Sequence, residues 1–271
     1  NFTSDTDVYN IGIGHRAGTA ITTGVQNTLI GGLAGDALTT GQQNTVLGYS
    51  ALTTDTLGIG SVAIGRAALE SQNFTTATTT YNVAVGYHAG LSVTTGINNT
   101  LIGGAAGDAL TDADTNVAVG GFALTNDTLG SKSVAIGHSA LEAQNFTTAT
   151  NTHNTAVGDN VGKAITTGVQ NTLMGSAAGD AITTAGYNTA MGSGALGTNI
   201  LSSANVAIGQ DSLSAHNVAS AANGYNTAVG TNAGAAVSTA VQSTLIGALA
   251  GDSITTGVQN TIVGYNNDVD T

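Results

Sequence analysis

Residues able to carry catalysis or to bind a metal are few and scattered in this chain. Cysteine is absent, which excludes disulfides and thiolate metal sites. The histidines share no column at metal-ligand spacing, and no serine, histidine and aspartate set has a local signature of nucleophilic catalysis. They are His15, His88, His138, His153 and His216. The sequence therefore predicts a protein that is not an enzyme and that uses no metal and no cofactor.

One aspartate recurs at a fixed interval along the chain and could serve as a calcium ligand. The copies are Asp36, Asp108, Asp180 and Asp252. Four turns of a solenoid between copies would separate them by about 19 Å. A calcium ion holds its oxygen ligands at about 2.3–2.6 Å, so these positions cannot share one ion. Calcium at Asp36 would need ligands from neighbouring turns or chains, and a solvated turn residue is the favoured interpretation.

Two further polar patterns recur along the chain. Threonine pairs such as Thr22-Thr23 and Thr39-Thr40 could form a hydroxyl array that matches ice, although β-propensity also explains them. A column of asparagines could present amides to a glycan, but a ladder that satisfies turn backbone between stacked repeats is the favoured interpretation. Its members include Asn27, Asn44, Asn82, Asn99 and Asn116.

A longer loop returns in every fourth repeat, at residues 70–81, 142–153 and 214–225. Loops on a rigid scaffold often carry binding residues, and an aromatic ring beside amides suits stacking on a sugar. The candidate surface-binding residues are Asn73, Phe74, Tyr81, Asn145, Phe146, His153 and Tyr225. The alternative is that the phenylalanines fold back and cover the scaffold.

These residues are positioned by a short repeat that runs through the whole chain. The pentapeptide Asn27-Thr28-Leu29-Ile30-Gly31 returns in variants such as Asn82-Val83-Ala84-Val85-Gly86, and the sequence separations of its closing glycines read 17, 17, 17 and 21 in a repeating cycle. The closing glycines are Gly14, Gly31, Gly48, Gly65, Gly86, Gly103, Gly120, Gly137, Gly158, Gly175, Gly192, Gly209, Gly230, Gly247 and Gly264. A fixed period of this size is typical of a repeat architecture.

The repeat predicts an all-β parallel β-solenoid of about fifteen coils, each of about 17 or 21 residues, with no helix. Each coil should hold the pentapeptide strand and a second short strand near Ile21-Thr22 or Leu38-Thr39. Residues 1–271 would then form a single continuous domain with a super-repeat of four coils, about 72 residues in length. Residues 1–9 match residues 73–81, which suggests a fragment of a longer fibre.

The strand pattern also predicts self-association. In Asn82-Val83-Ala84-Val85-Gly86 the valines share one face, and we expect Ala84 and its equivalents, such as Leu101, to face outward. A strand that is apolar on both faces is buried on both faces. A symmetric homo-oligomer is the simplest source of the missing cover.

Composition excludes several classes of partner. Four basic residues against sixteen acidic residues give a formal net charge of −12. Nucleic acids and anionic membrane surfaces both require lysine and arginine for affinity, so neither is an expected partner. No apolar run is long enough to span a bilayer, and we expect no direct membrane insertion.

Two segments resemble the head repeat of YadA-type trimeric autotransporter adhesins. They are Ser61-Val62-Ala63-Ile64-Gly65-Arg66-Ala67-Ala68 and Ser133-Val134-Ala135-Ile136-Gly137-His138-Ser139-Ala140. Asn226-Thr227-Ala228-Val229-Gly230 is similar to a related repeat of bacteriophage tail fibres. The resemblance implies a left-handed β-roll, a homotrimer and extracellular attachment. The chain departs from the adhesins in its longer coils and in having no heptad stalk and no membrane anchor.

Together these patterns predict a non-enzymatic head or shaft of an attachment fibre, located outside the cell, on a cell surface or on a virion. Its partners would be copies of itself and a host-surface glycan or protein. One alternative is a self-assembling structural filament without a receptor. A second alternative is an ice-binding solenoid.

Overall fold

The computed structural model describes residues 8–267, which form an all-β parallel solenoid of about fifteen turns with no helix in that range. Two compact units are present. The first comprises Asn1–Ser133 and Phe146–Asn151, and the second comprises Val134–Asn145 and Thr152–Thr271. Residues 1–7, which carry most of the match to residues 73–81, lie outside the described range.

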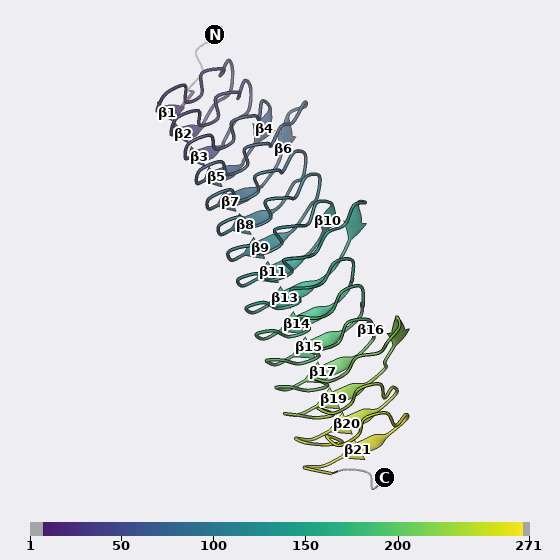
Figure 1. Cartoon of the computed structure of the whole chain (residues 1–271). Helices are drawn as coiled ribbons and strands as arrows, with labels where there is room; N and C mark the ends of the chain where they lie inside the picture. The colour runs from purple at the N-terminus through teal and green to yellow at the C-terminus, as the bar shows by residue number, and fades with distance from the viewer. Residues whose placement is uncertain (1–7, 268–271) are drawn as a thin grey trace. The chain divides into compact units, whose positions relative to one another are not determined.

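In the first unit, short strands stack in chain order into a parallel sheet, as the purple-to-teal part of Figure 1 shows. They are β1 (Ile11–Ile13), β2 (Thr28–Ile30), β3 (Thr45–Leu47), β5 (Val62–Ile64), β7 (Val83–Val85), β8 (Thr100–Ile102) and β9 (Val117–Val119). Every one of these strands is the centre of a repeat pentapeptide and ends directly before its closing glycine.

In the second unit the main strands also stack in parallel and in chain order (Figure 1). Its strands are β11 (Val134–Ile136), β13 (Thr155–Val157), β14 (Thr172–Met174), β15 (Thr189–Met191), β17 (Val206–Ile208), β19 (Thr227–Val229), β20 (Thr244–Ile246) and β21 (Thr261–Val263). Threonine, valine and isoleucine at the first and third positions of most of these strands agree with β-propensity.

Strand register follows the sequence period, which confirms the predicted stacking. Ile64 pairs with Val85, and Val85 pairs with Ile102. Ile64 and Val85 are 21 residues apart, and Val85 and Ile102 are 17 residues apart. These are the two spacings of the closing glycines. Each coil lies directly on the preceding coil within its unit.

The second strand is formed in only some coils. It occurs where the longer loop returns, as the pairs β4 (Gly58–Ile59) with β6 (Thr78–Thr79), β10 (Gly130–Ser131) with β12 (Thr150–Asn151), and β16 (Ser202–Ser203) with β18 (Ala222–Asn223). The predicted strand at Ile21-Thr22 is wrong. The predicted strand at Leu38-Thr39 is wrong as well, because the chain bends at both places. The amides of Thr22, Thr23 and Gly24 all donate to the carbonyl of Thr39 in the next coil (2.9, 3.3 and 3.2 Å) and form no ladder.

The outward face of the main strands was also predicted wrongly. Ala84 and Leu101 have no exposed surface, whereas Val85 is half-buried and Ile102 is 38% exposed. The middle residue of each strand points into the narrow coil, where alanine fits most easily. The bulkier first and third residues therefore point outward.

The interior alternates between apolar and polar pairs of coils. The residue four positions after the closing glycine is glycine in two successive coils, as at Gly18 and Gly35, and leucine in the next two, as at Leu52 and Leu69. Leu29 and Leu38 fill the space beside Gly35. In the coils that place leucine at this position, the residue seven positions after the glycine is polar and buried, as at Asp55.

The closing glycines permit the close stacking of coils. Gly86 has a φ of +145°, and a Cβ atom there would collide with the carbonyl oxygen of Gly103 in the next coil. Only glycine can adopt this backbone conformation and also leave room for the backbone of the next coil at this distance. The other glycines of the predicted structural set, Gly31, Gly48, Gly65 and Gly103, meet the next coil in the same way.

Candidate functional site

The asparagine column lies inside the solenoid and does not face solvent. Asn82 and Asn99 have no exposed surface. Asn99 Nδ2 donates to the carbonyl of Ala113 (2.8 Å), and Asn99 Oδ1 accepts from the amide of Asn116 (3.0 Å). Asn27 and Asn44 make the equivalent bonds in the first coils. The amides therefore pair the backbone of successive coils and cannot present themselves to a glycan.

Threonine hydroxyls are also used within the solenoid. Thr22 Oγ1 donates to the carbonyl of Thr39 (3.2 Å), and Thr39 Oγ1 donates to the carbonyl of Thr56 (3.1 Å). Thr94 and Thr111 repeat the pattern. The first hydroxyl of each of these pairs is therefore used within the solenoid and not held free for a ligand.

The recurring aspartates lie on turns, where Asp36 and Asp108 contact neighbouring coils. Asp36 accepts from Thr53 Oγ1 (2.5 Å) and faces Arg16 at 3.4 Å, and Asp108 accepts from Thr125 Oγ1. Burial raises the pKa of Asp180. Within residues 8–267, no group of three or more histidine, aspartate or glutamate side chains is arranged to hold a metal ion. The positions give no support to a calcium site.

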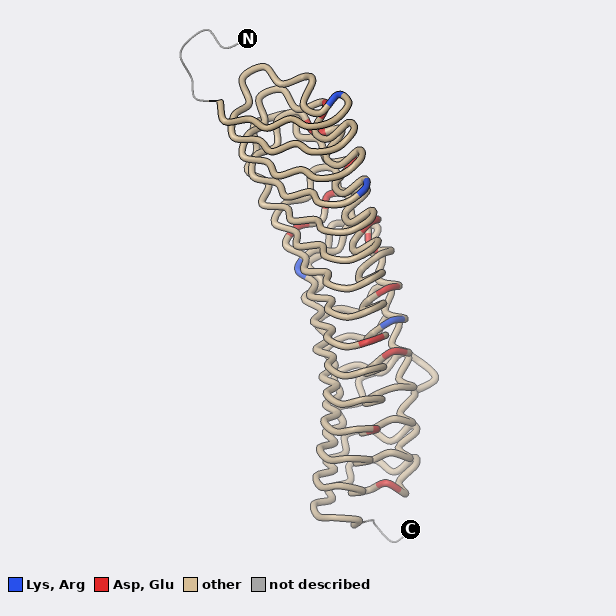
Figure 2. Tube along the Cα trace, turned by 90° about the vertical axis from the view of Figure 1, so that its left-hand side faces the viewer, with Lys and Arg blue, Asp and Glu red and all other residues tan. Residues whose placement is uncertain are grey.

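Other charges are sparse and lie outside the strands of the main sheets (Figure 2). Lys163 Nζ lies 3.4 Å from Glu142 Oε2, and His138 Nδ1 lies 3.6 Å from Asp159 Oδ1. A hydrogen bond with Ser139, followed by the effect of Lys163, lowers the pKa of Glu142. These exposed pairs join neighbouring coils but do not form a catalytic arrangement.

A buried polar layer spans the coils that carry the longer loop. Asp55 Oδ1 accepts from the amides of Gly58 (3.1 Å) and Phe74 (3.3 Å), and Asp55 Oδ2 accepts from Gln72 Nε2 (2.7 Å). Gln72 Oε1 in turn accepts from Asn82 Nδ2 (2.9 Å). Burial raises the pKa of Asp55. Every member has a partner, so the layer is a structural network that anchors the loop.

The third super-repeat fills the same layer with different residues. Asn199 replaces the aspartate and His216 replaces the glutamine. His216 Nε2 lies 2.9 Å from Ser202 Oγ, while Nδ1 is buried without a well-formed hydrogen bond. Burial lowers the pKa of His216, and the nearby Ser238 backbone offsets part of this effect. The imidazole is therefore held neutral inside the fold.

The predicted loop site is only partly on the surface. Phe74 and Phe146 are each only 6% exposed, so the expectation that they stack on a sugar is corrected. Their backbones are tied into the buried layer through Asp55 and Asp127, because each amide donates to an aspartate Oδ1. The phenylalanines thus cover the solenoid, as the alternative interpretation held.

The remaining members of the predicted loop site are more accessible. Tyr81 is 66% exposed, and Tyr225 is 56% exposed with its hydroxyl bonded to Asn223 Nδ2 (2.7 Å). Asn145 and His153 are exposed, and Asn73 is half-buried. Because these residues belong to three copies of the loop in successive super-repeats, the structure does not bring them together into one site.

An exposed cluster of a different kind lies on the first unit. Arg66 Nη1 lies 2.7 Å from His88 Nε2 and donates to the Tyr87 hydroxyl (3.2 Å). The Tyr87 and His88 rings are stacked, with centroids 3.8 Å apart. Tyr49 lies one coil before Arg66, and its ring rests against Gly32. We call Tyr49, Arg66, Tyr87 and His88 the aromatic–arginine surface.

Backbone hydrogen bonds fix this surface across consecutive coils. The amide of Ala67 donates to the Tyr49 carbonyl (2.9 Å), and the amide of His88 donates to the Arg66 carbonyl (3.0 Å). Tyr49, Arg66 and Tyr87 therefore occupy successive rungs of one column. Both tyrosines are more than half exposed, so the rings and the guanidinium group are open to a ligand.

Sequence reasoning missed this surface, although the sequence contains a signal for it. The equivalent positions of the second super-repeat hold Gly121, His138, Asp159 and Asn160, and those of the third hold Ser193, Gln210, Thr231 and Asn232. The closing glycines keep their residue type between super-repeats. A comparison of the super-repeats with one another would have shown that these four positions do not.

In each unit an apolar column runs along the outer face of the main strands and is formed by the third residue of each strand. In the first unit it comprises Ile13, Ile30, Leu47, Ile64, Val85, Ile102 and Val119. In the second unit it comprises Ile136, Val157, Met174, Met191, Ile208, Val229, Ile246 and Val263. None of these side chains is fully buried. Contiguous exposed apolar surface of this kind marks an interaction site.

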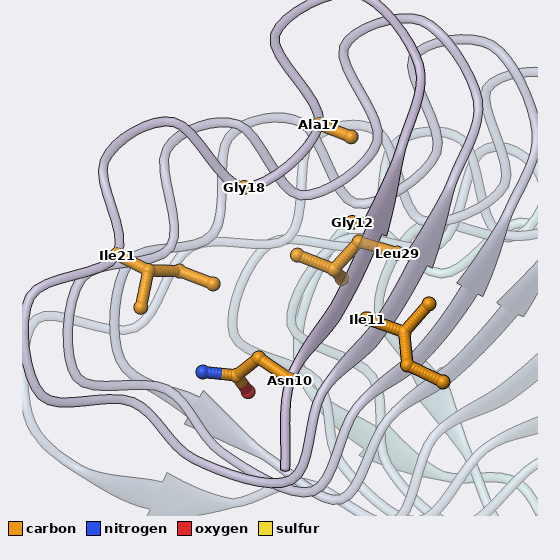
Figure 3. Close-up of a pocket in the computed structure, with 7 residues that line it drawn as sticks. All are labelled: Asn10, Ile11, Gly12, Ala17, Gly18, Ile21 and Leu29. Atoms are coloured by element: carbon orange, nitrogen blue, oxygen red, sulfur yellow. The ribbon is translucent and has the colours of Figure 1, made fainter. Parts of the chain in front are cut away.

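A hollow of about 230 Å³ lies beside β1 and is lined by Asn10, Ile11, Gly12, Ala17, Gly18, Ile21 and Leu29 (Figure 3). Gly12 occupies the inward position that alanine or leucine fills in most other coils, and Gly18 adds no side chain. The lining is mostly apolar and includes no titratable side chain. It is the exposed end of the core in the described part of the first unit.

No protein-family model matches the chain, and no curated protein matches it. The likeness to adhesin and tail-fibre repeats therefore stays a prediction. Between residues 8 and 267, there is no helix of the length and apolarity needed to cross a membrane.

Proposed function

We propose that this chain is a non-enzymatic, extracellular structural protein that forms the head or shaft of an attachment fibre. Its apolar column would be covered by other copies of the chain in a homo-oligomer, which the adhesin resemblance suggests is a trimer. Attachment to a cell surface or virion partner would then use side chains outside that column.

The apolar column is the observation that carries this proposal. Ile102 and Met174 are 38% and 45% exposed, and no strand within residues 8–267 contains a charged residue. Burial of apolar surface contributes about 25 cal/mol per Å², so a covered column would be favoured over an exposed one. A second copy offers a matching surface, because its side chains repeat at the same spacing of about 4.8 Å between strands.

Mechanical stiffness would follow from the interior. Backbone ladders join every coil to the next, and the asparagine ladder satisfies the turns that the strands leave open. Such a column needs no catalytic group. It would hold its exposed residues at fixed spacing from the surface to which the fibre is anchored.

Light scattering on the purified chain tests the proposal. We expect a discrete mass of three chains that does not change with concentration. Replacing Ile64 and Ile102 with lysine should reduce this mass toward one chain, because charges would then be placed in the interface. The control replaces the exposed Thr40 and Thr75 with lysine and should leave the mass unchanged. A monomeric parent chain would contradict the proposal.

A self-assembling filament without a receptor is the second candidate. Strand β1 lies at the end of its sheet in the described range, and Ile11 and Ile13 are 50% and 59% exposed there. Open strand edges favour pairing with another chain. In the same light-scattering experiment a filament would grow continuously with concentration. Ice binding has less support, because the first threonine hydroxyl of pairs such as Thr22-Thr23 and Thr39-Thr40 donates to a protein carbonyl.

A further inference from the structure

We propose that the aromatic–arginine surface, Tyr49, Arg66, Tyr87 and His88, is a binding site for a glycan that carries carboxylate groups. The inference deepens the proposed attachment function and rests on it. It assigns the receptor contact to this face of the first unit and not to the phenylalanine-containing loops.

The first argument is that Arg66 lacks an acidic partner. In the second super-repeat the equivalent residue, His138, faces Asp159 at 3.6 Å. In the first super-repeat Tyr87 stands where that aspartate would be. Across residues 8–267, no carboxylate lies within ion-pair distance of Arg66, in a chain whose formal net charge is −12. The carboxylate of a ligand would supply the group that the protein omits.

The second argument is that the guanidinium group is already oriented. Arg66 Nη1 is held by the Tyr87 hydroxyl and His88 Nε2, and Arg66 Cζ lies 5.5 Å from the centroid of the Tyr87 ring. The other guanidinium donors are not engaged by any hydrogen bond found for the described residues. A planar carboxylate matches two such donors in a bidentate pair, which favours a uronic or sialic acid over a neutral sugar.

The third argument is the presence of two tyrosine rings on one column. Tyr49 and Tyr87 are 56% and 55% exposed, and the coil that carries Arg66 lies between them. Glycine stands at the equivalent positions on either side, at Gly32 and Gly104, so no side chain limits access along the column. From Tyr49 to Tyr87 the surface spans two coil steps, or about 10 Å. This length suits an oligosaccharide better than a single sugar.

The fourth argument comes from the repeat itself. The closing glycines, which the stacking of coils requires, recur in every super-repeat. The four positions of this surface instead become serine, glutamine, threonine and asparagine in the third super-repeat. The fold therefore does not require the residue types that these positions hold in the first super-repeat.

Isothermal titration of the full chain with tetragalacturonic acid tests the proposal, with maltotetraose as the neutral match. We expect the acidic sugar to bind at least tenfold more tightly than the neutral one, with one site per chain. The variant Tyr49→Ser, Arg66→Gln, Tyr87→Thr and His88→Asn should lose at least tenfold in affinity. Each introduced residue already occupies the equivalent position in the third super-repeat, so the variant should fold.

A reverse transfer gives a gain of binding. Replacing Ser193, Gln210, Thr231 and Asn232 with tyrosine, arginine, tyrosine and histidine should raise the stoichiometry from one to two sites per chain.

A tetra-aspartate peptide provides carboxylates without sugar rings and should bind at least tenfold more weakly than the acidic sugar.

The proposal is overturned if the parent chain does not bind tetragalacturonic acid, if the neutral sugar or the peptide binds equally well, or if the four-residue variant binds unchanged. Native mass is measured on the same samples. Failure of sugar binding with the trimer intact rejects this site alone, whereas a monomeric chain that binds the sugar rejects the proposed oligomeric fibre and keeps the site.

Discussion

Gln72 Nε2 donates a 2.7 Å hydrogen bond to Asp55 Oδ2 inside the solenoid, one coil away along the stack. The pair is fully buried, and it recurs as Asp127 and Gln144 in the second super-repeat. In the third super-repeat both members change together, to Asn199 and His216. This joint change indicates that the layer is constrained as a set.

Single exchanges in this layer should be destabilising. Gly58→Ser would bring a Cβ atom onto Asp55 Oδ2, and we expect a loss of about 1–3 kcal/mol in the free energy of unfolding. Asp55→Asn would place an amide donor against Gln72 Nε2, with a similar expected loss of about 1–3 kcal/mol. Chemical denaturation of each variant measures both losses.

Transfer of the complete third-repeat set should restore stability to within about 1 kcal/mol, because coupled neighbours are not additive. The set comprises Asp55→Asn, Gly58→Ser, Ser61→Asn, Gln72→His and Thr80→Gly. If the losses of the single variants simply added in the combined variant, the idea of a coupled layer would be wrong.

Lowering the pH should reduce the free energy of unfolding through the protonation of His216. Burial lowers its pKa below the ordinary value of 6.5, so the unfolded chain takes up a proton that the folded chain resists. The stability from this group is complete above pH 6.5 and falls as the pH drops toward the lowered pKa, by at most about 1.4 kcal/mol per pH unit. Unfolding experiments between pH 7.5 and 5.5 measure the slope.

His216→Gln installs the residue that the other super-repeats carry, as Gln72 and Gln144, and should flatten this pH dependence. His153→Asn is the matched control, because His153 is exposed and asparagine tolerates its positive φ of 52°. Equal slopes for the parent and the His216→Gln variant would assign the acid sensitivity to other groups.

Removal of one rung of the asparagine ladder should be costly. Asn99→Ala leaves the carbonyl of Ala113 and the amide of Asn116 unpaired in the interior, and we expect a loss of about 2–5 kcal/mol. The neighbouring Asn98 is exposed, with a φ of 59°. Asn98→Gly should therefore change stability by less than about 1 kcal/mol. Comparable losses in the two thermal or chemical melts would contradict a structural role for the ladder.

Adjacent glycines should differ sharply in their tolerance of alanine. Gly103 has a φ of +139°, and a Cβ atom there would strike the carbonyl of Gly120, whereas a Cβ atom on Gly104 meets no atom within 4 Å. We expect Gly103→Ala to cost more than about 3 kcal/mol and Gly104→Ala about 0.5 kcal/mol or less. Circular dichroism during denaturant titration would show the difference, and similar midpoints would refute the stacking role.

Much of the fold could be predicted because its information is local and periodic. The spacing of the closing glycines fixes which residues pair, and the pairing of Val85 with Ile102 confirms that prediction. The periodic pattern could not give the direction of the strand faces, since Val83, Ala84 and Val85 are all apolar. The width of the coil decides that Ala84 points inward, and width is a tertiary property.

The candidate site was harder to predict for a related reason. Phe74 looks like a surface aromatic in the sequence, but the aspartate that accepts from its amide lies one coil earlier and draws the loop inward. Tyr49, Arg66 and Tyr87 are far from one another in the chain and carry no motif. Only the stacking of coils makes them neighbours, so their relationship becomes visible once the register is known.

The alternation of apolar and polar layers limits how the gene for such a chain can lengthen. The coil that contains Asp55 needs the coil that contains Gln72 directly after it. The two apolar coils that contain Gly90 and Gly107 must then follow before the next aspartate, Asp127. Duplication of the aspartate coil alone would set one buried carboxylate against another. Growth or loss should therefore occur in whole blocks of four coils, each of which changes the stack by about 19 Å.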